Sequence, residues 1–140
     1  MTYAELEALI GRIALDTLAG VGHFHCGGSD SLKQAVENHG YPVIDLDPIT
    51  GTRNIETGNK VATITMGFFE KHENSPSASE LQAIYSRQEA ISARFLVMLD
   101  DEDDLGNIMV KDSLVPHHTA QNLAGIAIQF TLKLPISLCF

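Results

Sequence analysis

The sequence predicts an α+β fold: an antiparallel sheet of about four to five strands, with an N-terminal helix and one long helix packed on one face. Apolar and polar residues alternate strictly along 61–69 and 123–136, which is typical of strands with one buried face. Residues 79–99 instead carry apolar side chains at helical spacing. At 140 residues we expect a single domain spanning residues 1–140.

The N-terminal part of the chain alternates helices and short strands. An amphipathic helix is predicted at 3–19, followed by Gly20 and Gly22, because glycine readily takes the left-handed conformation that closes a helix. A strand at 21–26, a short helix at 31–38 and a strand at 43–47 are predicted after it. The cap of the short helix is Ser29 or Asp30.

A polar hairpin arm (residues 49–59) is predicted between two turn signals. The first is Pro48-Ile49-Thr50-Gly51. The second, Gly58-Asn59, is typical of a two-residue II′ turn. In the strand that follows, at 61–69, the even-numbered residues are apolar, and we expect them to face the core.

The long helix at 79–99 is predicted to begin at Ser77 or Ser79, either of which can cap it. Gln88 is the polar interruption in its apolar stripe. We expect the helix to end near Asp100, because the acidic run that follows opposes the helix dipole. Two closing strands are predicted at 105–115 and 123–136. Pro135 must lie at an edge or beyond the pairing, since it has no N–H to donate.

Charge and cysteine content exclude several classes of protein. With 9 basic and 18 acidic residues the net charge is −9, which argues against specific nucleic-acid binding. Cys26 and Cys139 are too few for a disulfide scaffold, so we expect free thiols in a reducing cytoplasm. The first residues do not resemble a signal peptide, and no apolar run approaches the ~20 residues that span a bilayer. We therefore expect no membrane association.

His23 and His25 form the most metal-like cluster, because alternate residues of a strand share a face. One ion could bind both imidazoles with Cys26 turned away. Further ligands would have to come from elsewhere, and the candidates are His39, His117 and His118. The alternative is a short polar strand beside a glycine loop, which we favour, so no metal ion is predicted.

Three other features suggest chemistry without specifying it. Asp45 and Asp47 share a strand face and could act as paired carboxylates, although an outward-facing polar edge is the simpler interpretation. The acidic run 100–104 lacks the spacing of a calcium loop. Residues 27–30 could hold an anion before a helix but lack the lysine of a phosphate loop. We predict no active site, no enzyme activity and no cofactor.

The layout resembles that of tail-terminator and tail-completion proteins of long-tailed bacteriophages and prophages. The elements that carry the resemblance are the helix 3–19, the strand 43–47, the arm, the strand 61–69, the helix 79–99 and the strand 123–136. The segment 21–39, with its histidines and glycines, departs from that pattern.

The resemblance implies a structural role. Such proteins form a homohexameric ring that caps the tail tube, stops its polymerisation and meets the head connector. It implies a location in the bacterial cytoplasm during assembly and in the virion tail afterwards. A closed ring needs heterologous contacts, for which the arm is suited. The implied interface residues are Thr52, Arg53, Asn54, Ile55 and Glu56.

Two alternatives remain open. One is a cytosolic adaptor domain that binds another protein through its exposed sheet face. The other is a small metal-binding enzyme that uses His23 and His25. A stoichiometric metal ion would favour the enzyme, and a monomer that changes size only with its partner would favour the adaptor.

Overall fold

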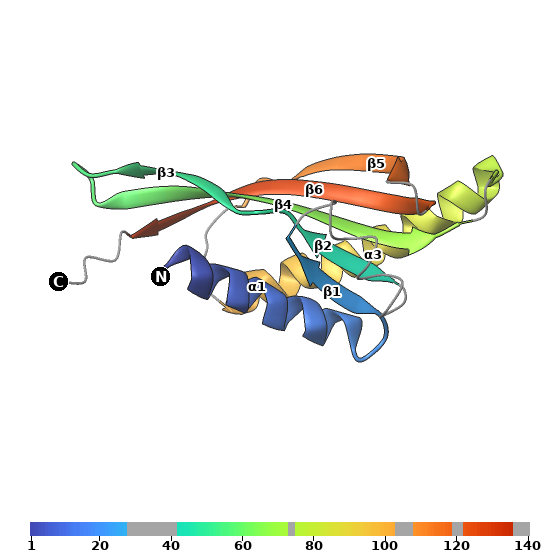
Figure 1. The fold of residues 1–140 in the computed structure, drawn as a ribbon, viewed down its shortest axis with the longest axis horizontal. Helices are drawn as coiled ribbons and strands as arrows, with labels where there is room; N and C mark the ends of the chain where they lie inside the picture. Colours follow the sequence, from blue (N-terminus) through green and yellow to red (C-terminus); the bar gives the residue numbers. More distant parts are fainter. Residues whose placement is uncertain (28–41, 73–74, 103–107, 119–121, 136–140) are drawn as a thin grey trace.

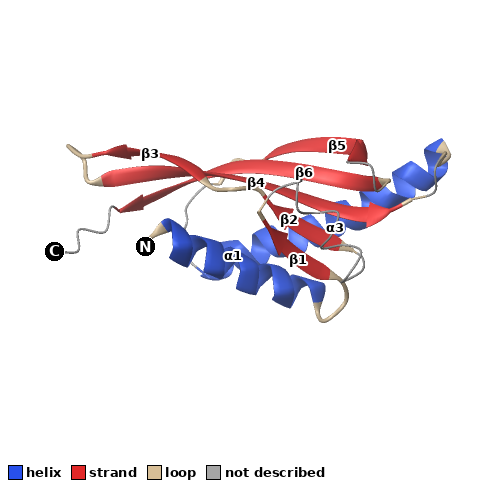
Figure 2. Cartoon of the chain, viewed as in Figure 1, coloured by secondary structure: helices blue, strands red, loops and turns tan. Residues whose placement is uncertain are grey.

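The computed structural model describes residues 1–27, 42–72, 75–102, 108–118 and 122–135. Within these ranges two helices pack against a six-stranded sheet, which confirms the predicted α+β class (Figures 1 and 2). The elements in chain order are α1 (Tyr3–Leu18), β1 (His23–Cys26), β2 (Val43–Leu46), β3 (Thr50–Asn54), β4 (Asn59–Lys71), α3 (Ala78–Glu102), β5 (Lys111–His118) and β6 (Leu123–Pro135). The short helix predicted at 31–38 lies outside the described residues. Neither described helix is both long and apolar enough to cross a membrane.

The sheet is mixed, with the strand order β1-β2-β4-β6-β5 and β3 paired to β4. β1 and β2 run parallel, while the other pairs are antiparallel. The prediction of a fully antiparallel sheet with fewer strands is therefore corrected. Alternation of side chains reveals that a segment is a strand but not which way it runs. The chain between β1 and β2 is long enough for the crossover that parallel neighbours require.

β4 and β6 form the central ladder, which pairs Asn59 with Pro135 at one end and Lys71 with Leu123 at the other. Pro135 thus occupies the last position of the ladder, as its missing N–H predicted. β2 and β3 both pair along the same edge of β4, β3 near its beginning and β2 near its end.

The helix ends partly differ from the sequence predictions. Thr2 caps α1 by accepting a hydrogen bond from the N–H of Glu5 at 3.1 Å. Ala19, and not a glycine, takes the first left-handed position after α1, at φ 52°, and Gly20 follows at φ 83°. Ser77 caps α3, because its hydroxyl accepts from the N–H of Glu80 at 3.2 Å.

α3 continues through Asp100 and Asp101 to Glu102, within two residues of the predicted end near Asp100. Leu99 is fully buried, and burying a leucine side chain contributes about 1.5–3 kcal/mol. An unfavourable charge at a helix terminus costs only about 0.3–1 kcal/mol. Three such charges, on Asp100, Asp101 and Glu102, cost about 1–3 kcal/mol together, which is similar to the contribution from burying Leu99.

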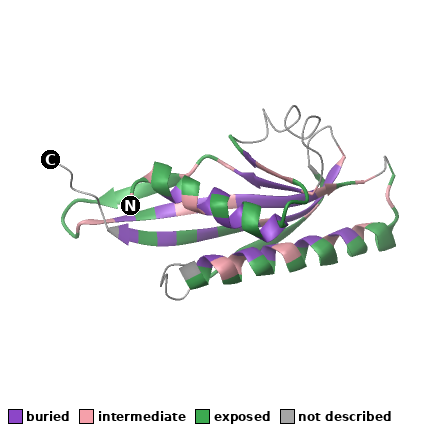
Figure 3. Cartoon of the chain, turned by 90° about the horizontal axis from the view of Figure 1, so that it is seen from below, coloured by how far each residue is buried: buried purple, intermediate pink, exposed green. Residues whose placement is uncertain are grey.

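α1 and α3 cover the same face of the sheet, and their buried stripes point toward it (Figure 3). The even-numbered residues of β4 and β6 supply the sheet side of this core, as the alternation predicted. Phe68 and Phe95 meet there with ring centroids 5.8 Å apart. A smaller buried cluster on the opposite face contains Val43, Phe69 and Leu123.

Candidate functional site

The arm extends away from the body of the molecule, beyond the N-terminal end of α1 (Figure 1). Its first strand, β3, is exposed along its whole length. The residues predicted at an interface, from Thr52 to Glu56, are all exposed. Ile55, at the tip of the arm, is 78% exposed. The arm therefore presents both backbone and apolar surface to the surroundings.

The tip of the arm is a four-residue loop, because the last residue pair below it is Asn54 with Asn59. The two-residue turn predicted at Gly58-Asn59 is therefore wrong. The carboxamide oxygen of Asn54 accepts hydrogen bonds from the N–H groups of Glu56 at 3.0 Å and Thr57 at 3.3 Å. Such local side-chain bonds stabilise turns. Gly58 closes the loop at φ 70°.

The base of the arm is fixed to the N-terminus of the chain. The ammonium group of Lys60 lies 4.4 Å from the centre of the Tyr3 ring, and Lys60 is only 5% exposed. A Cβ at Gly51 would come within 2.3 Å of the Tyr3 hydroxyl and 2.9 Å of the carbonyl oxygen of Val61, so a larger residue there would have to displace the Tyr3 ring. The arm is therefore anchored at its base and exposed at its tip.

His25 and Asp45 form a buried pair on the face opposite α1 and α3. His25 Nδ1 lies 2.7 Å from Asp45 Oδ1, and the parallel register of β1 and β2 places the two residues side by side. Asp45 is 2% exposed, so the expectation of an outward-facing polar edge is wrong for this residue. Since burying a carboxylate without a partner is costly, the pair explains how Asp45 is accommodated.

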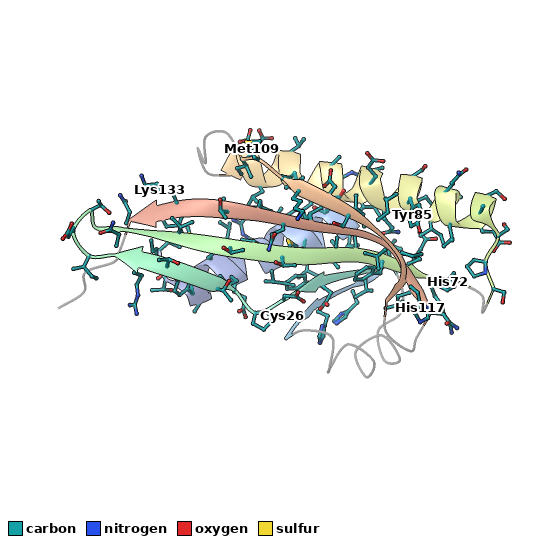
Figure 4. The ribbon with its side chains drawn as sticks, turned by 90° about the horizontal axis from the view of Figure 1, so that it is seen from above. Cys26, His72, Tyr85, Met109, His117 and Lys133 are labelled. Atoms are coloured by element: carbon teal, nitrogen blue, oxygen red, sulfur yellow. The ribbon has the colours of Figure 1, made fainter. Side chains whose placement is uncertain are left out.

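The candidate metal ligands His23 and His25 are not joined by a third ligand among the described residues. No group of three or more potential ligands that could hold a metal ion occurs there. His117 lies beside His72, with ring centroids 6.0 Å apart, at the end of the sheet where β4 and β5 finish (Figure 4). His39 lies outside the described residues. The structure thus gives His25 a carboxylate partner in place of a described metal site.

Cys26 faces α1, on the other side of β1 from His25, and its thiol is free and exposed. Partial burial, a hydrogen bond to Glu7 and the charges of Glu7 and Asp45 raise its pKa from 9.0 to about 11. Because the thiolate is the nucleophile and metal ligand, a raised pKa makes this cysteine unreactive at neutral pH. Cys139 lies outside the described residues.

A second polar group, which the sequence did not predict, joins α3 to β4. Arg87 Nε donates to both carboxylate oxygens of Glu70, at 3.1 and 3.2 Å, and Gln88 Nε2 donates to the same carboxylate at 2.6 Å. The carboxylate of Glu70 raises the pKa of Arg87. Gln88 is 1% exposed, and its Oε1 accepts no hydrogen bond among the described residues. The one feature of the sequence that pointed to this polar group was Gln88, which interrupts the apolar stripe of the helix.

A cavity of about 800 Å³ opens beside this group, lined in part by Glu70, His72, Arg87 and Asn122. The Glu70 carboxylate is already neutralised by Arg87, and no serine or cysteine lines the cavity among the described residues. The arrangement ties α3 to the sheet, and Lys71 and His72 also line the cavity.

The remaining candidates are structural where they are described. Asp100 and Asp101 are exposed on the last turn of α3. Gly27 begins the candidate anion loop at φ 132°, and the rest of that loop lies outside the described residues. Asp47 is half-buried after β2, and its N–H donates to the carbonyl of Thr65.

Comparison with models of known protein families and with curated proteins finds no match to this chain.

Proposed function

We propose that this protein is a structural assembly protein whose identical subunits form a closed ring, as tail terminators of long-tailed bacteriophages do. The observation that carries the proposal is the exposed arm. A strand edge with unpaired N–H and C=O groups is a template for pairing with another chain. The tip adds Ile55, with 78% of its surface exposed. Thr52, Arg53, Asn54, Ile55 and Glu56 are the proposed intersubunit contacts.

The position of the arm favours a head-to-tail contact. It protrudes from one end of the molecule, and its base is held by Tyr3 and Lys60 (Figure 1). An arm that enters a different surface of the next copy makes a heterologous contact. Repetition of such a contact closes into a ring when the rotation between copies allows it. A stiff, anchored arm loses less conformational entropy on docking than a disordered one would.

The charge of the chain suits a ring through which DNA passes. The net charge is −9 per subunit, and the described carboxylates of both helices are exposed. Like charge repels the DNA backbone and disfavours sticking in the lumen. In the proposed role the ring caps a tail tube and meets a head connector, first in the bacterial cytoplasm and then in the virion tail. No catalytic residue and no cofactor is part of this role.

The mass of the purified chain in solution tests the proposal. Light scattering across a concentration series is expected to give a species of about 91 kDa, six times the 15.2 kDa chain, and negative-stain images should show rings. A monomer at every concentration would contradict self-assembly. It would favour the alternative of an adaptor that docks through its sheet.

A further inference from the structure

β3 and β5 form open edges on opposite sides of the sheet (Figure 4). Among the described residues β3 pairs only with β4, and β5 pairs only with β6. The open segment of β3 is Thr50–Asn54, which is exposed throughout. On β5 it is Lys111–Val115, exposed except for the half-buried Val115. A bulge and Pro116 interrupt β5 after Val115, so the two open segments have the same length.

On β3, the backbone N–H and C=O groups of Gly51 and Arg53 point to the open side. The N–H of Asp47 donates to the carbonyl of Thr65, so the odd-numbered residues of β4 form their hydrogen bonds on the side of β2 and β3. The even-numbered residues of β3 lie opposite these residues and bond to them. Because the bonding direction alternates from residue to residue, Gly51 and Arg53 point outward.

On β5, the corresponding outward residues are Asp112 and Leu114. The N–H of His72 donates to the carbonyl of Asn122, so even-numbered residues of β6 bond to β4 and odd-numbered ones bond to β5. The odd-numbered residues of β5 lie opposite the latter. Asp112 and Leu114 therefore offer their N–H and C=O groups to a further strand.

The side chains of Arg53 and Asp112 lie on the same face of the sheet. Arg53 is opposite Lys60, which contacts Tyr3 of α1, and Asp112 is opposite the buried Ile128. Both charged side chains are exposed, and neither forms an ion pair with another described residue. Since like charges directly opposite each other are unfavourable, Arg53 beside Lys60 would gain from an acidic neighbour on its open side.

We propose that β3 of one copy pairs with β5 of a second copy, with Arg53 opposite Asp112 and Thr52 opposite Ser113. Repeating the subunit without turning it over makes this pair antiparallel and keeps the helices of both copies on one side of the sheet. A shift by one residue would place the two charges on opposite faces. The inference rests on the proposed ring and names the edges that join its subunits. Because the two edges differ, the contact is heterologous.

This register also covers exposed apolar side chains. Leu114, 59% exposed, comes opposite Gly51, over which the Tyr3 ring lies. The arm tip then extends past the residues before Lys111 and brings Ile55 next to Met109. These two side chains, 78% and 88% exposed, are the most exposed large hydrophobic residues in the described part of the chain.

The offset between the two edges suits a sheet that closes on itself. The row through Lys111 crosses β4 at Thr65, whereas Asn54 lies opposite Asn59, six residues away on β4. Joining the two rows moves each copy about 20 Å along the strands for about 19 Å across four of them, a strand tilt of about 45°. Closed sheets typically have tilts of about 35–45°.

Engineered cysteines test the register. In a Cys26→Ser, Cys139→Ser background, Thr52→Cys and Ser113→Cys occupy a pair without hydrogen bonds, where Cα atoms lie about 4.5 Å apart and a disulfide can form. Within one chain β4 and β6 separate the two positions, so the disulfide must join two copies. Oxidation is expected to give a ladder of covalent oligomers on a non-reducing gel, up to a closed ring.

Two controls accompany this variant. The matched control replaces Ser113→Cys by Ser86→Cys, which lies at an exposed serine on α3, and it should stay monomeric on the gel. Thr52→Cys alone should stay monomeric as well. A covalent dimer of that single-cysteine protein would mean that β3 pairs with β3 and would overturn the proposal.

A charge exchange supplies a second measurement. Arg53→Asp is expected to raise the concentration at half-association about fivefold, because a like-charged pair replaces an opposite one. Adding Asp112→Arg should restore most of the loss. If the double-cysteine variant assembles without a ladder, or if the exchange restores nothing, the pairing is overturned and the ring stands. A wild-type protein that is monomeric throughout would overturn the ring and, with it, this inference.

Discussion

At the scale of single residues, the side chains that the sequence misplaced are those whose partner lies far along the chain. Alternation along 43–47 places Asp45 on the face away from the helices, but it does not show that His25 lies beside it at 2.7 Å. Glu70 and Arg87 meet only because α3 folds back on β4. Local patterns predict which face a residue occupies, whereas these pairs depend on strand order and on helix placement.

Cys26 provides a residue-scale prediction with a defined pH dependence. Its pKa of about 11 leaves only on the order of one thiolate in a thousand at pH 8. In a Cys139→Ser background, alkylation by iodoacetamide should speed up about tenfold per pH unit until pH approaches 11. Glu7→Ala should lower the pKa and raise the rate at pH 8. A folded protein that is alkylated at pH 8 as fast as the denatured chain would contradict the structure.

The raised pKa of Cys26 also determines whether the free energy of unfolding rises or falls with pH. The folded thiol holds its proton to higher pH than the unfolded thiol, whose pKa is 9.0. The unfolded state therefore binds fewer protons between pH 9 and about 11, and the contribution of Cys26 to the free energy of unfolding falls over that window.

At the scale of elements, the sequence predicted the two helices and the long strands because their periodicities are uninterrupted. It missed the direction of β1 relative to β2, since periodicity carries no direction. It placed the end of α3 near Asp100, within two residues of the observed end at Glu102. The tip loop is longer than the predicted two-residue turn because the carboxamide of Asn54 stabilises the longer loop.

Substitution of Gly125 tests how closely β6 approaches β4. A Cβ there would lie 1.8 Å from the carbonyl oxygen of Phe68, a backbone atom that cannot move independently. Gly125→Ala should lower the free energy of unfolding in urea by about 3 kcal/mol. Gly58→Ala is the matched control, because nothing lies within 4 Å of its Cβ. It should cost about 1 kcal/mol, from its positive φ alone. Equal losses of unfolding free energy in the two variants would show that β6 and β4 are less closely packed at Gly125 than the structure has them.

At the scale of the whole molecule, the body encloses a buried core, whereas the arm is exposed. Two helices and the sheet bury one continuous core, while β3 and Ile55 remain outside it. The sequence predicted an exposed arm from its polar residues and turn signals. It did not reveal that β1 packs beside α1 and brings Phe24 against Gly11.

Self-association through the arm is tested by comparing the solution masses of three proteins at one concentration. The wild-type chain and the Val97→Asp variant, whose change lies at an exposed site on α3, should both form the same assembly of about 91 kDa, six times 15.2 kDa. Ile55→Asp places a charge at the arm tip and should give a 15.2 kDa monomer that remains folded by circular dichroism. An Ile55→Asp protein that assembles as well as the wild type would show that the arm does not hold the subunits together.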